Sequence, residues 1–380
     1  MANTLEPKEI TQSSGSVIKQ MSINNHEQVV FCNDNETGLK AIIAIHNTIL
    51  GPALGGTRMW AYNNEAEALN DVLRLSRGMT YKAAISGLNL GGGKAVIIGD
   101  SKKIKSEPLM RRFGKFVNSL GGKYITAEDV GIGTKDMEYV KMETNHVTGI
   151  PESMGGSGDP SPVTAFGVYM GMKASAKFAY GSDSLNGKKV FVQGIGHVGE
   201  NLVNYLIKEG AKVTIFDIHE EKLIECANST GATIFKGADV YEADMDIYAP
   251  CALGATLNSD SIAKLKCSII AGAANNQLED EIVHGKMLLD KGIVWAPDFL
   301  INAGGLINVY SELHGYNREA AMSNAQKIYD LTSSILKVAQ TESITTIVAA
   351  KNIAEKRIAE IGKVKLSFQF LKKELQKLER

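Results

Sequence analysis

A glycine-rich turn between a strand and a helix constrains the second half of this chain more than any other feature. The sequence GIGHVG at residues 194–199 matches the pattern G-x-G-x-x-G. It follows an apolar run at 190–192 and precedes a helical pattern at 201–208, and a second apolar run ends at Asp217. This order of strand, turn, helix, strand and acidic residue is typical of a dinucleotide-binding unit. The sequence therefore predicts a Rossmann-type domain.

Each part of this turn has a physical purpose. The first glycine permits a tight turn, the second lets the backbone approach a pyrophosphate, and the third lets the helix pack closely on the strand. The start of the helix adds unpaired N–H donors. The carboxylate of Asp217 is expected to bind the ribose 2′-hydroxyl and so to favour NAD over NADP. A structural glycine turn without a ligand is the alternative. The expected cofactor-binding residues are Gly194, Ile195, Gly196, His197, Val198, Gly199, Glu200 and Asp217.

The order of the remaining elements predicts an α/β protein of two domains. Apolar runs at 189–193, 212–216, 246–249, 268–271 and 292–295 alternate with helical patterns, which indicates a parallel sheet covered on both faces. Before residue 150, strands are expected at 27–32, 39–49, 95–98 and 124–125, and helices at 109–120 and at 65–77, where Gly78 should end the helix. The polar segment 155–162 resembles a hinge that opens a helix over 163–178.

We therefore expect a mixed-sheet substrate-binding and catalytic domain over 1–150 and a doubly wound, Rossmann-type domain over 151–345. C-terminal helices over 346–380 should pack back toward the first domain. Residues 1–14 are polar and are expected to be disordered.

Composition and charge exclude several classes of function. Lysine and arginine total 41 against 42 acidic residues, so there is no broad basic surface for nucleic acid or an anionic membrane. No apolar run reaches the roughly 18 to 20 residues that span a bilayer, and the polar N-terminus is unlike a secretory signal. Four cysteines lie far apart without a Cys-x-x-Cys pair, which favours reduced thiols and no metal. A cytoplasmic location is expected.

Two lysines in glycine-rich surroundings are candidates for chemistry. Lys94 follows three glycines, but the segment is not a phosphate-binding loop, because Leu88 stands where its first glycine should be and Ala95 replaces Ser or Thr. Lys82 lies twelve residues earlier. Two lysines in one apolar pocket would repel each other, which lowers one pKa and makes a general base. Spacing alone equally allows two ordinary surface lysines.

Seven segments resemble those of the glutamate, leucine, phenylalanine and valine dehydrogenase family, and most closely its leucine-specific members. They are GPALGGTRMW, RGMTYK, LNLGGGKAVIIGD, YITAEDVG, YAPCALGAT, IAGAANNQL and INAGGLINV, and the resemblance runs from about residue 27 to near the C-terminus. It implies an enzyme that reversibly deaminates an L-amino acid to a 2-oxo acid and ammonia, with NAD as cofactor. It also implies a homo-oligomer, an octamer.

The resemblance also assigns roles to single residues. Lys94 would be the general base that activates water, and Asp129 would serve proton transfer beside it. Lys82 would bind the substrate carboxylate. Asn276 would orient the substrate toward the nicotinamide, and Thr164 would contact the nicotinamide amide.

The residue at position 54 decides between substrates. Glutamate-specific relatives carry a lysine there, whereas Leu54 would leave a side-chain carboxylate without a partner, at a cost of several kcal/mol. Phenylalanine-specific relatives tend to have glycine at Ala127, so leucine, isoleucine and valine are favoured. Because one methyl group discriminates by only about 1 to 3 kcal/mol, a phenylalanine or valine dehydrogenase is the alternative.

A non-enzymatic NAD sensor would not need these polar residues, and the two lysines argue against a folate-pathway dehydrogenase. Gly55 and Gly56 should let the substrate approach the backbone. By resemblance, the side-chain pocket comprises Leu54, Gly55, Met79, Ala127, Leu306 and Val309.

Overall fold

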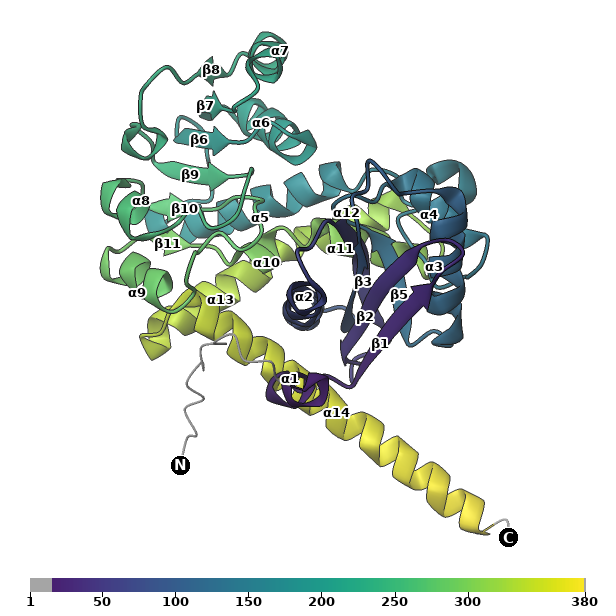
Figure 1. Cartoon of the computed structure of the whole chain (residues 1–380). Coiled ribbons are helices and arrows are strands. Elements are labelled where there is room, and N and C mark those ends of the chain that lie inside the picture. The colour runs from purple at the N-terminus through teal and green to yellow at the C-terminus, as the bar shows by residue number, and fades with distance from the viewer. Residues whose placement is uncertain (1–15, 379–380) are drawn as a thin grey trace.

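The fold contains two β-sheets, each with its own helices, and a long C-terminal helix (Figure 1). This computed structural model describes the backbone of residues 16–378 and the side chains of residues 16–364. The disorder expected for residues 1–14 lies outside the described residues. None of the described helices is long and apolar enough to cross a membrane.

The first sheet is mixed and has five strands in the order β1-β2-β4-β3-β5. Strand β2 runs antiparallel to both of its neighbours, whereas β3 is parallel to β4 and to β5. Strand β3, between β4 and β5, carries the segment ALGGTRMW, which the sequence patterns did not identify as a strand. The strands are β1 (Gln28–Asp34), β2 (Leu39–Asn47), β3 (Ala53–Trp60), β4 (Gly91–Ile98) and β5 (Tyr124–Glu128).

Helices cover both faces of this sheet. Helices α3 (Glu107–Ser119) and α4 (Thr134–Lys141) bury Phe113 and Val140 against one face. Helix α2 (Glu65–Ile85) covers the opposite face, and the short helix α1 (Val17–Asn24) lies against it.

The expected end of α2 at Gly78 is wrong, because the helix continues to Ile85. A Cβ atom at Gly78 would meet open space, and the last residues of the helix, Ala83, Ala84 and Ile85, are buried. Burial of this last turn outweighs the cost of about 1 kcal/mol for a glycine inside a helix. The correction places Lys82 in the last turn of α2.

The second sheet is entirely parallel, in the order β11-β10-β9-β6-β7-β8. The order reverses between β6 and β9, which is the point where dinucleotides bind in such sheets. Side chains alternate between two cores, so that Val190 and Val192 face one cluster and Phe191 faces the other. The strands are β6 (Lys189–Gln193), β7 (Lys212–Phe216), β8 (Thr233–Ile234), β9 (Ile247–Pro250), β10 (Ile269–Ile270) and β11 (Val294–Trp295).

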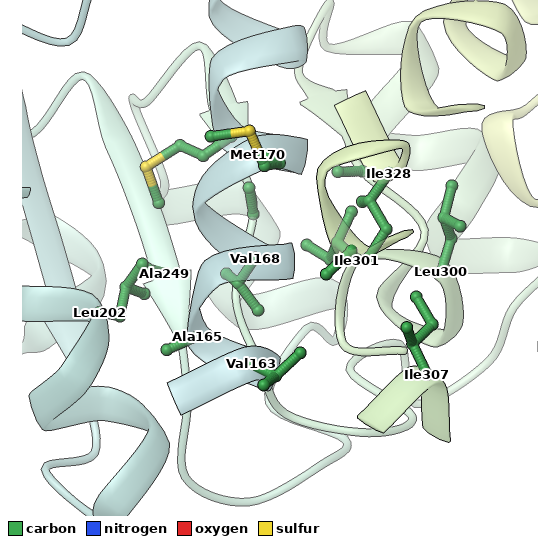
Figure 2. Close-up of a cluster of buried hydrophobic side chains, with 14 of the residues drawn as sticks. Val163, Ala165, Val168, Met170, Leu202, Ala249, Leu300, Ile301, Ile307 and Ile328 are labelled. Carbon is green, nitrogen blue, oxygen red and sulfur yellow. The ribbon is translucent and has the colours of Figure 1, made fainter. Parts of the chain in front are cut away.

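Helices flank the second sheet. A central helix, α5 (Ser161–Tyr180), lies between α6 on one side and the segment around Ile301 on the other (Figure 2). Gly171 allows this close contact, since a Cβ atom there would lie 2.2 Å from Cγ2 of Ile301. The other helices are α6 (His197–Glu209), α7 (Glu220–Thr230), α8 (Ser259–Lys264), α9 (Val283–Asp290), α10 (Asp298–Ile301), α11 (Gly304–Glu312), α12 (Arg318–Gln326) and α13 (Ile328–Glu342).

The C-terminal helix α14 (Thr346–Leu378) joins the two halves (Figure 1). It packs against both α13 and α2. The Arg357 guanidinium donates to the Leu88 carbonyl at 2.7 Å and to the Gly87 carbonyl at 3.1 Å, and the Tyr81 hydroxyl donates to Glu355 at 2.8 Å. The predicted fold, a mixed-sheet domain, a Rossmann-type domain and C-terminal helices, is confirmed.

Candidate active site

A buried lysine on β4 contacts a carboxylate that follows β5. Lys94 is 6% exposed, and its Nζ donates to Oδ2 of Asp129. Arg58, on β3 between these strands, holds its Nη2 3.9 Å from Oδ1 of Asp129. The neighbouring parallel strands β4, β3 and β5 thus bring two cations to one carboxylate.

The surroundings of Asp129 keep it ionised. Burial by itself raises the pKa of this carboxyl, but the charges of Lys94 and Arg58 and the N–H of Val130 lower it to about 2. Opposite charges within a few ångströms favour the charged form of a buried acid. Lys94 is therefore paired with an ionised carboxylate.

The second lysine approaches the same site from α2. Nζ of Lys82 donates to Oδ1 of Asn302 at 2.7 Å. Burial lowers the pKa of Lys82 to about 8, with a further contribution from the charge of Lys94, while Asp298 and Asp129 act in the opposite direction. Lys82 is half-buried, and it is close enough to Lys94 and Asp129 for their charges to act on it.

Glycines in β4 make this proximity possible. A Cβ atom on Gly92 would lie 2.1 Å from Oγ1 of Thr80, and one on Gly93 would lie 2.7 Å from the Tyr124 ring. Only glycine lets β4 run this close to α2 and to β5. Gly55 and Gly56 have the same purpose, because a Cβ atom on Gly55 would lie 1.8 Å from the Gly93 carbonyl oxygen. These two glycines are thus required for strand packing, whatever room they also leave for a substrate.

Most of the predicted side-chain pocket lies in one apolar cluster. Leu54 is 2% exposed and shares this cluster with Leu306 and Val309 of α11, and Met79 of α2 packs against it. Ala127 is buried on β5, in register with Gly56.

The glycine turn after β6 has the geometry that a dinucleotide needs. Gly194 has φ +105°, and a Cβ atom on Gly199 would lie 2.0 Å from the Gly194 carbonyl oxygen. Gly196 and His197 are exposed at the start of α6, where Val198 and Glu200 also lie. The N–H groups of a first helical turn have no partner within the helix, so the residues present fit a pyrophosphate.

Asp217 supports this turn directly, a contact that the sequence did not reveal. Its Oδ2 accepts from the Ile195 N–H at 2.7 Å, and its Oδ1 accepts from the His219 N–H at 2.9 Å. Burial opposes ionisation, but these two N–H donors lower the pKa of Asp217. The carboxylate is therefore held at the tip of β7 beside the glycine turn, whose backbone it fixes.

The other two predicted residues lie at loop ends of the second domain. The Thr164 hydroxyl, in the first turn of α5, donates to the Pro160 carbonyl at 2.9 Å. Asn276 is exposed in the loop after β10 and has φ +51°, a left-handed conformation that asparagine tolerates.

Sequence reasoning missed two buried polar residues near Lys82. Asn302 donates from Nδ2 to Oδ1 of Asn275 at 2.7 Å and to the Ala273 carbonyl at 3.0 Å. Asp298 accepts from the Gln277 N–H at 2.9 Å, and burial raises the pKa of this carboxyl to about 6. Neither stands in a motif with a chemical signature. The only signal was that Asn302 belongs to the string INAGGLINV.

Both halves of the chain match domains of one family of known proteins. Residues 26–146 match the dimerisation domain of Glu/Leu/Phe/Val dehydrogenases, and residues 155–365 match the Glutamate/Leucine/Phenylalanine/Valine dehydrogenase domain. The leucine dehydrogenase of Geobacillus stearothermophilus is 54% identical over 93% of this chain and 96% of its own.

Relatives with other substrates are also similar. The phenylalanine dehydrogenase of Lysinibacillus sphaericus is 49% identical over 88% of this chain and 89% of its own. The crystal structure of L-tryptophan dehydrogenase from Nostoc punctiforme has a TM-score of 0.81 and 45% identity, covering 91% of this chain and 99% of that one. The two domain matches and these relatives show that the chain is an amino acid dehydrogenase and belongs to the Glu/Leu/Phe/Val dehydrogenase family.

Proposed function

We propose that the chain catalyses the NAD-dependent, reversible oxidative deamination of L-leucine and related branched-chain L-amino acids to 2-oxo acids and ammonia. The observation that carries the substrate choice is that Leu54, Leu306 and Val309 are all apolar and buried in one cluster. An aliphatic side chain buried there gains roughly 1.5 to 3 kcal/mol, whereas a carboxylate would lose its hydration without a partner.

Lys82 and Lys94 bind and orient the reacting end of the amino acid. The ammonium of Lys82 is the ligand for the substrate carboxylate, since a charge-assisted bond to a carboxylate is worth about 1.5 to 3 kcal/mol. Lys94, on the facing strand, lies at the substrate amino group. Asn276 and Thr164 orient substrate and nicotinamide. A dinucleotide held at the turn Gly194 to Gly199 would supply the acceptor for the hydride that leaves the substrate Cα.

Lys94 and Asp129 handle the protons of the following hydrolysis. As general base, Lys94 takes a proton from the water that attacks the iminium carbon and gives it to the nitrogen of the resulting carbinolamine. The carbinolamine hydroxyl then gives its proton to the Lys94–Asp129 pair as the C–N bond breaks, which releases ammonia and the 2-oxo acid. Asp129 keeps a low pKa partly through the charge of Lys94. When Lys94 is neutral, that contribution is lost, so Asp129 becomes a stronger base and assists the proton transfer.

NAD is the proposed cofactor because of Asp217. Its carboxylate lies beside the glycine turn and keeps a lowered pKa, so it is anionic near neutral pH. An anion at this point accepts hydrogen bonds from ribose hydroxyls and repels a 2′-phosphate. The cofactor-binding residues are those proposed from the sequence, Gly194 to Glu200 with Asp217.

We also propose that the chain forms a homo-oligomer. The model matched by residues 26–146 is described as a dimerisation domain. An octamer is the size that the family resemblance implies. Light scattering on the purified protein measures the mass directly, and a monomer would contradict the proposal.

Phenylalanine is the second candidate substrate, because relatives that act on aromatic amino acids are nearly as similar as the leucine dehydrogenases. A panel of L-leucine, L-isoleucine, L-valine, L-phenylalanine, L-tryptophan and L-glutamate, followed by NADH absorbance at alkaline pH, distinguishes them. We expect the highest kcat/KM for a branched-chain amino acid and little activity with glutamate or with NADP. A highest value for an aromatic amino acid or for glutamate would contradict the proposed substrate.

A further inference from the structure

One asparagine joins the two halves of the site at Lys82. Asn302 caps the C-terminal end of α10 in the second half of the chain, and its Oδ1 accepts from Nζ of Lys82, on α2, at 2.7 Å. Asn302 is 4% exposed. Helices α2 and α10 pack against each other, so this contact lies where the two halves meet (Figure 1).

The orientation of this amide is fixed by its other hydrogen bonds. Nδ2 of Asn302 donates to Oδ1 of Asn275 at 2.7 Å and to the Ala273 carbonyl at 3.0 Å. A side-chain amide has two N–H groups, and both are used. The oxygen must therefore face Lys82, and the same amide holds the loop that continues into Asn276.

The side chain that accepts the hydrogen bond from Lys82 carries no charge. Asn302 is neutral, so it orients the ammonium of Lys82 without neutralising it. The charged groups that act on Lys82 are Asp298 of α10, Asp129 after β5 and Lys94 of β4. None of the carboxylates among the described residues forms an ion pair with Lys82; its hydrogen bond goes to the amide. Its positive charge thus stays available to an incoming carboxylate.

We propose that Asn302 is a positioning residue that aims Lys82 at the substrate α-carboxylate and couples it to the loop that carries Asn276. This inference rests on the proposed role of Lys82 in amino acid oxidation. It does not depend on which side chain is preferred, because every L-amino acid carries the same carboxylate. The hydrogen bonds from Lys82 to Asn302 and from Asn302 to Asn275 thus fix the two halves of the site relative to each other around one substrate.

Two substitutions with opposite electrostatic effects test this role. Asn302→Ala removes the acceptor, and Asn302→Asp replaces it with an anion that neutralises Lys82. Both should raise the KM for the amino acid by about 10-fold or more, with a smaller change in kcat and in the KM for NAD. Asn302→Ser provides a smaller, neutral acceptor if one of these variants does not fold, and should give an intermediate KM.

The basic limb of the kcat/KM profile gives a readout that a purely structural role would not move. Loss of the acceptor makes the ammonium less stable, so Asn302→Ala should shift this limb to lower pH. An added anion stabilises the ammonium, so Asn302→Asp should shift it to higher pH. Ser86→Ala is the matched control, because Ser86 donates to the backbone carbonyl of Lys82 at 2.7 Å and leaves the ammonium alone. It should leave both quantities unchanged.

The outcomes separate this inference from the proposed function. The amino acid that the wild-type protein oxidises fastest is used throughout. If the wild-type protein oxidises an amino acid but the Asn302 variants keep its KM and the basic limb of its kcat/KM profile, the role of Asn302 alone is overturned. Shifts of the limb in the same direction for Ala and Asp would also overturn it. If the wild-type protein oxidised none of the six amino acids, the proposed function would fail first, and this inference with it.

Discussion

The substitution Leu54→Lys should change the preferred substrate from leucine toward glutamate. Leu54 is 2% exposed among Leu306, Val309 and other apolar side chains. A lysine there faces the hydrocarbon of a bound leucine, which costs several kcal/mol for an unpaired polar group. With glutamate, the same ammonium meets a carboxylate and regains about 1.5 to 3 kcal/mol.

The two effects act in opposite directions on the two substrates. Together they amount to roughly 3 to 6 kcal/mol, or about a 10²- to 10⁴-fold change in the ratio of the kcat/KM values. The assay is the initial rate of NADH formation with each amino acid, and thermal unfolding shows whether the variant is folded. Leu54→Met, which conserves volume and polarity, is the control and should keep the preference for leucine.

The reasoning would be refuted by a folded Leu54→Lys protein that prefers leucine by the wild-type margin. Leu54 would then not face the substrate side chain, and the argument against glutamate would lose its basis. A uniform fall of both rates with an unchanged ratio would lead to the same conclusion.

Three further predictions follow from the geometry. Lys82→Ala should raise the KM for L-leucine by the equivalent of about 1.5 to 3 kcal/mol while the affinity for NAD is retained, and an equal KM in variant and wild type would rule out Lys82 as the carboxylate ligand. Asp217→Ser combined with Ile218→Arg should move the ratio of the kcat/KM values from NAD toward NADP. The double substitution removes the anion, and Ile218 is 84% exposed, so an arginine there is free to bind a phosphate. Asp217→Asn is the control, because it removes the charge but keeps an oxygen that accepts from the Ile195 N–H. His26 and His46 are buried and in contact, and burial lowers the pKa of each from 6.5 to about 4. Because the unfolded chain binds these protons more readily, each histidine should cost up to about 3 kcal/mol of stability as the pH falls from 6.5 to 4. In urea denaturation, His46→Gln should therefore lose less stability than the wild type between these pH values, and an equal loss in both proteins would contradict this prediction.

The second domain was predictable because its signals are local. The runs that became β6 and β7 contain valine, phenylalanine and isoleucine, and the turn at Gly194 lies between a strand and a helix. Parallel strands buried on both faces give such continuous apolar runs. The position of Asp217 followed from the same unit, although its bond to the Ile195 N–H did not.

The first domain was harder because its glycines have a tertiary cause. Gly78 suggested the end of a helix, and no strand was predicted around Gly55 and Gly56, yet the structure places these glycines inside α2 and β3. Gly92 is explained only by Thr80 of the neighbouring helix, which no local pattern contains. Asn302 was missed for the same reason, since its contact with Lys82 joins residues that lie 220 positions apart.

The most direct test of the account is the turnover of Lys94→Ala measured beside its affinity for NADH. Lys94 contacts Asp129 and lies on the first sheet, whereas the glycine turn belongs to the second sheet, so loss of the base should leave the dinucleotide site intact. We expect kcat for L-leucine to fall by about 10² to 10⁴, the range that general base catalysis commonly supplies, while the Kd for NADH from its fluorescence stays at the wild-type value. A variant that binds NADH normally and keeps more than about a tenth of the wild-type turnover would contradict the account.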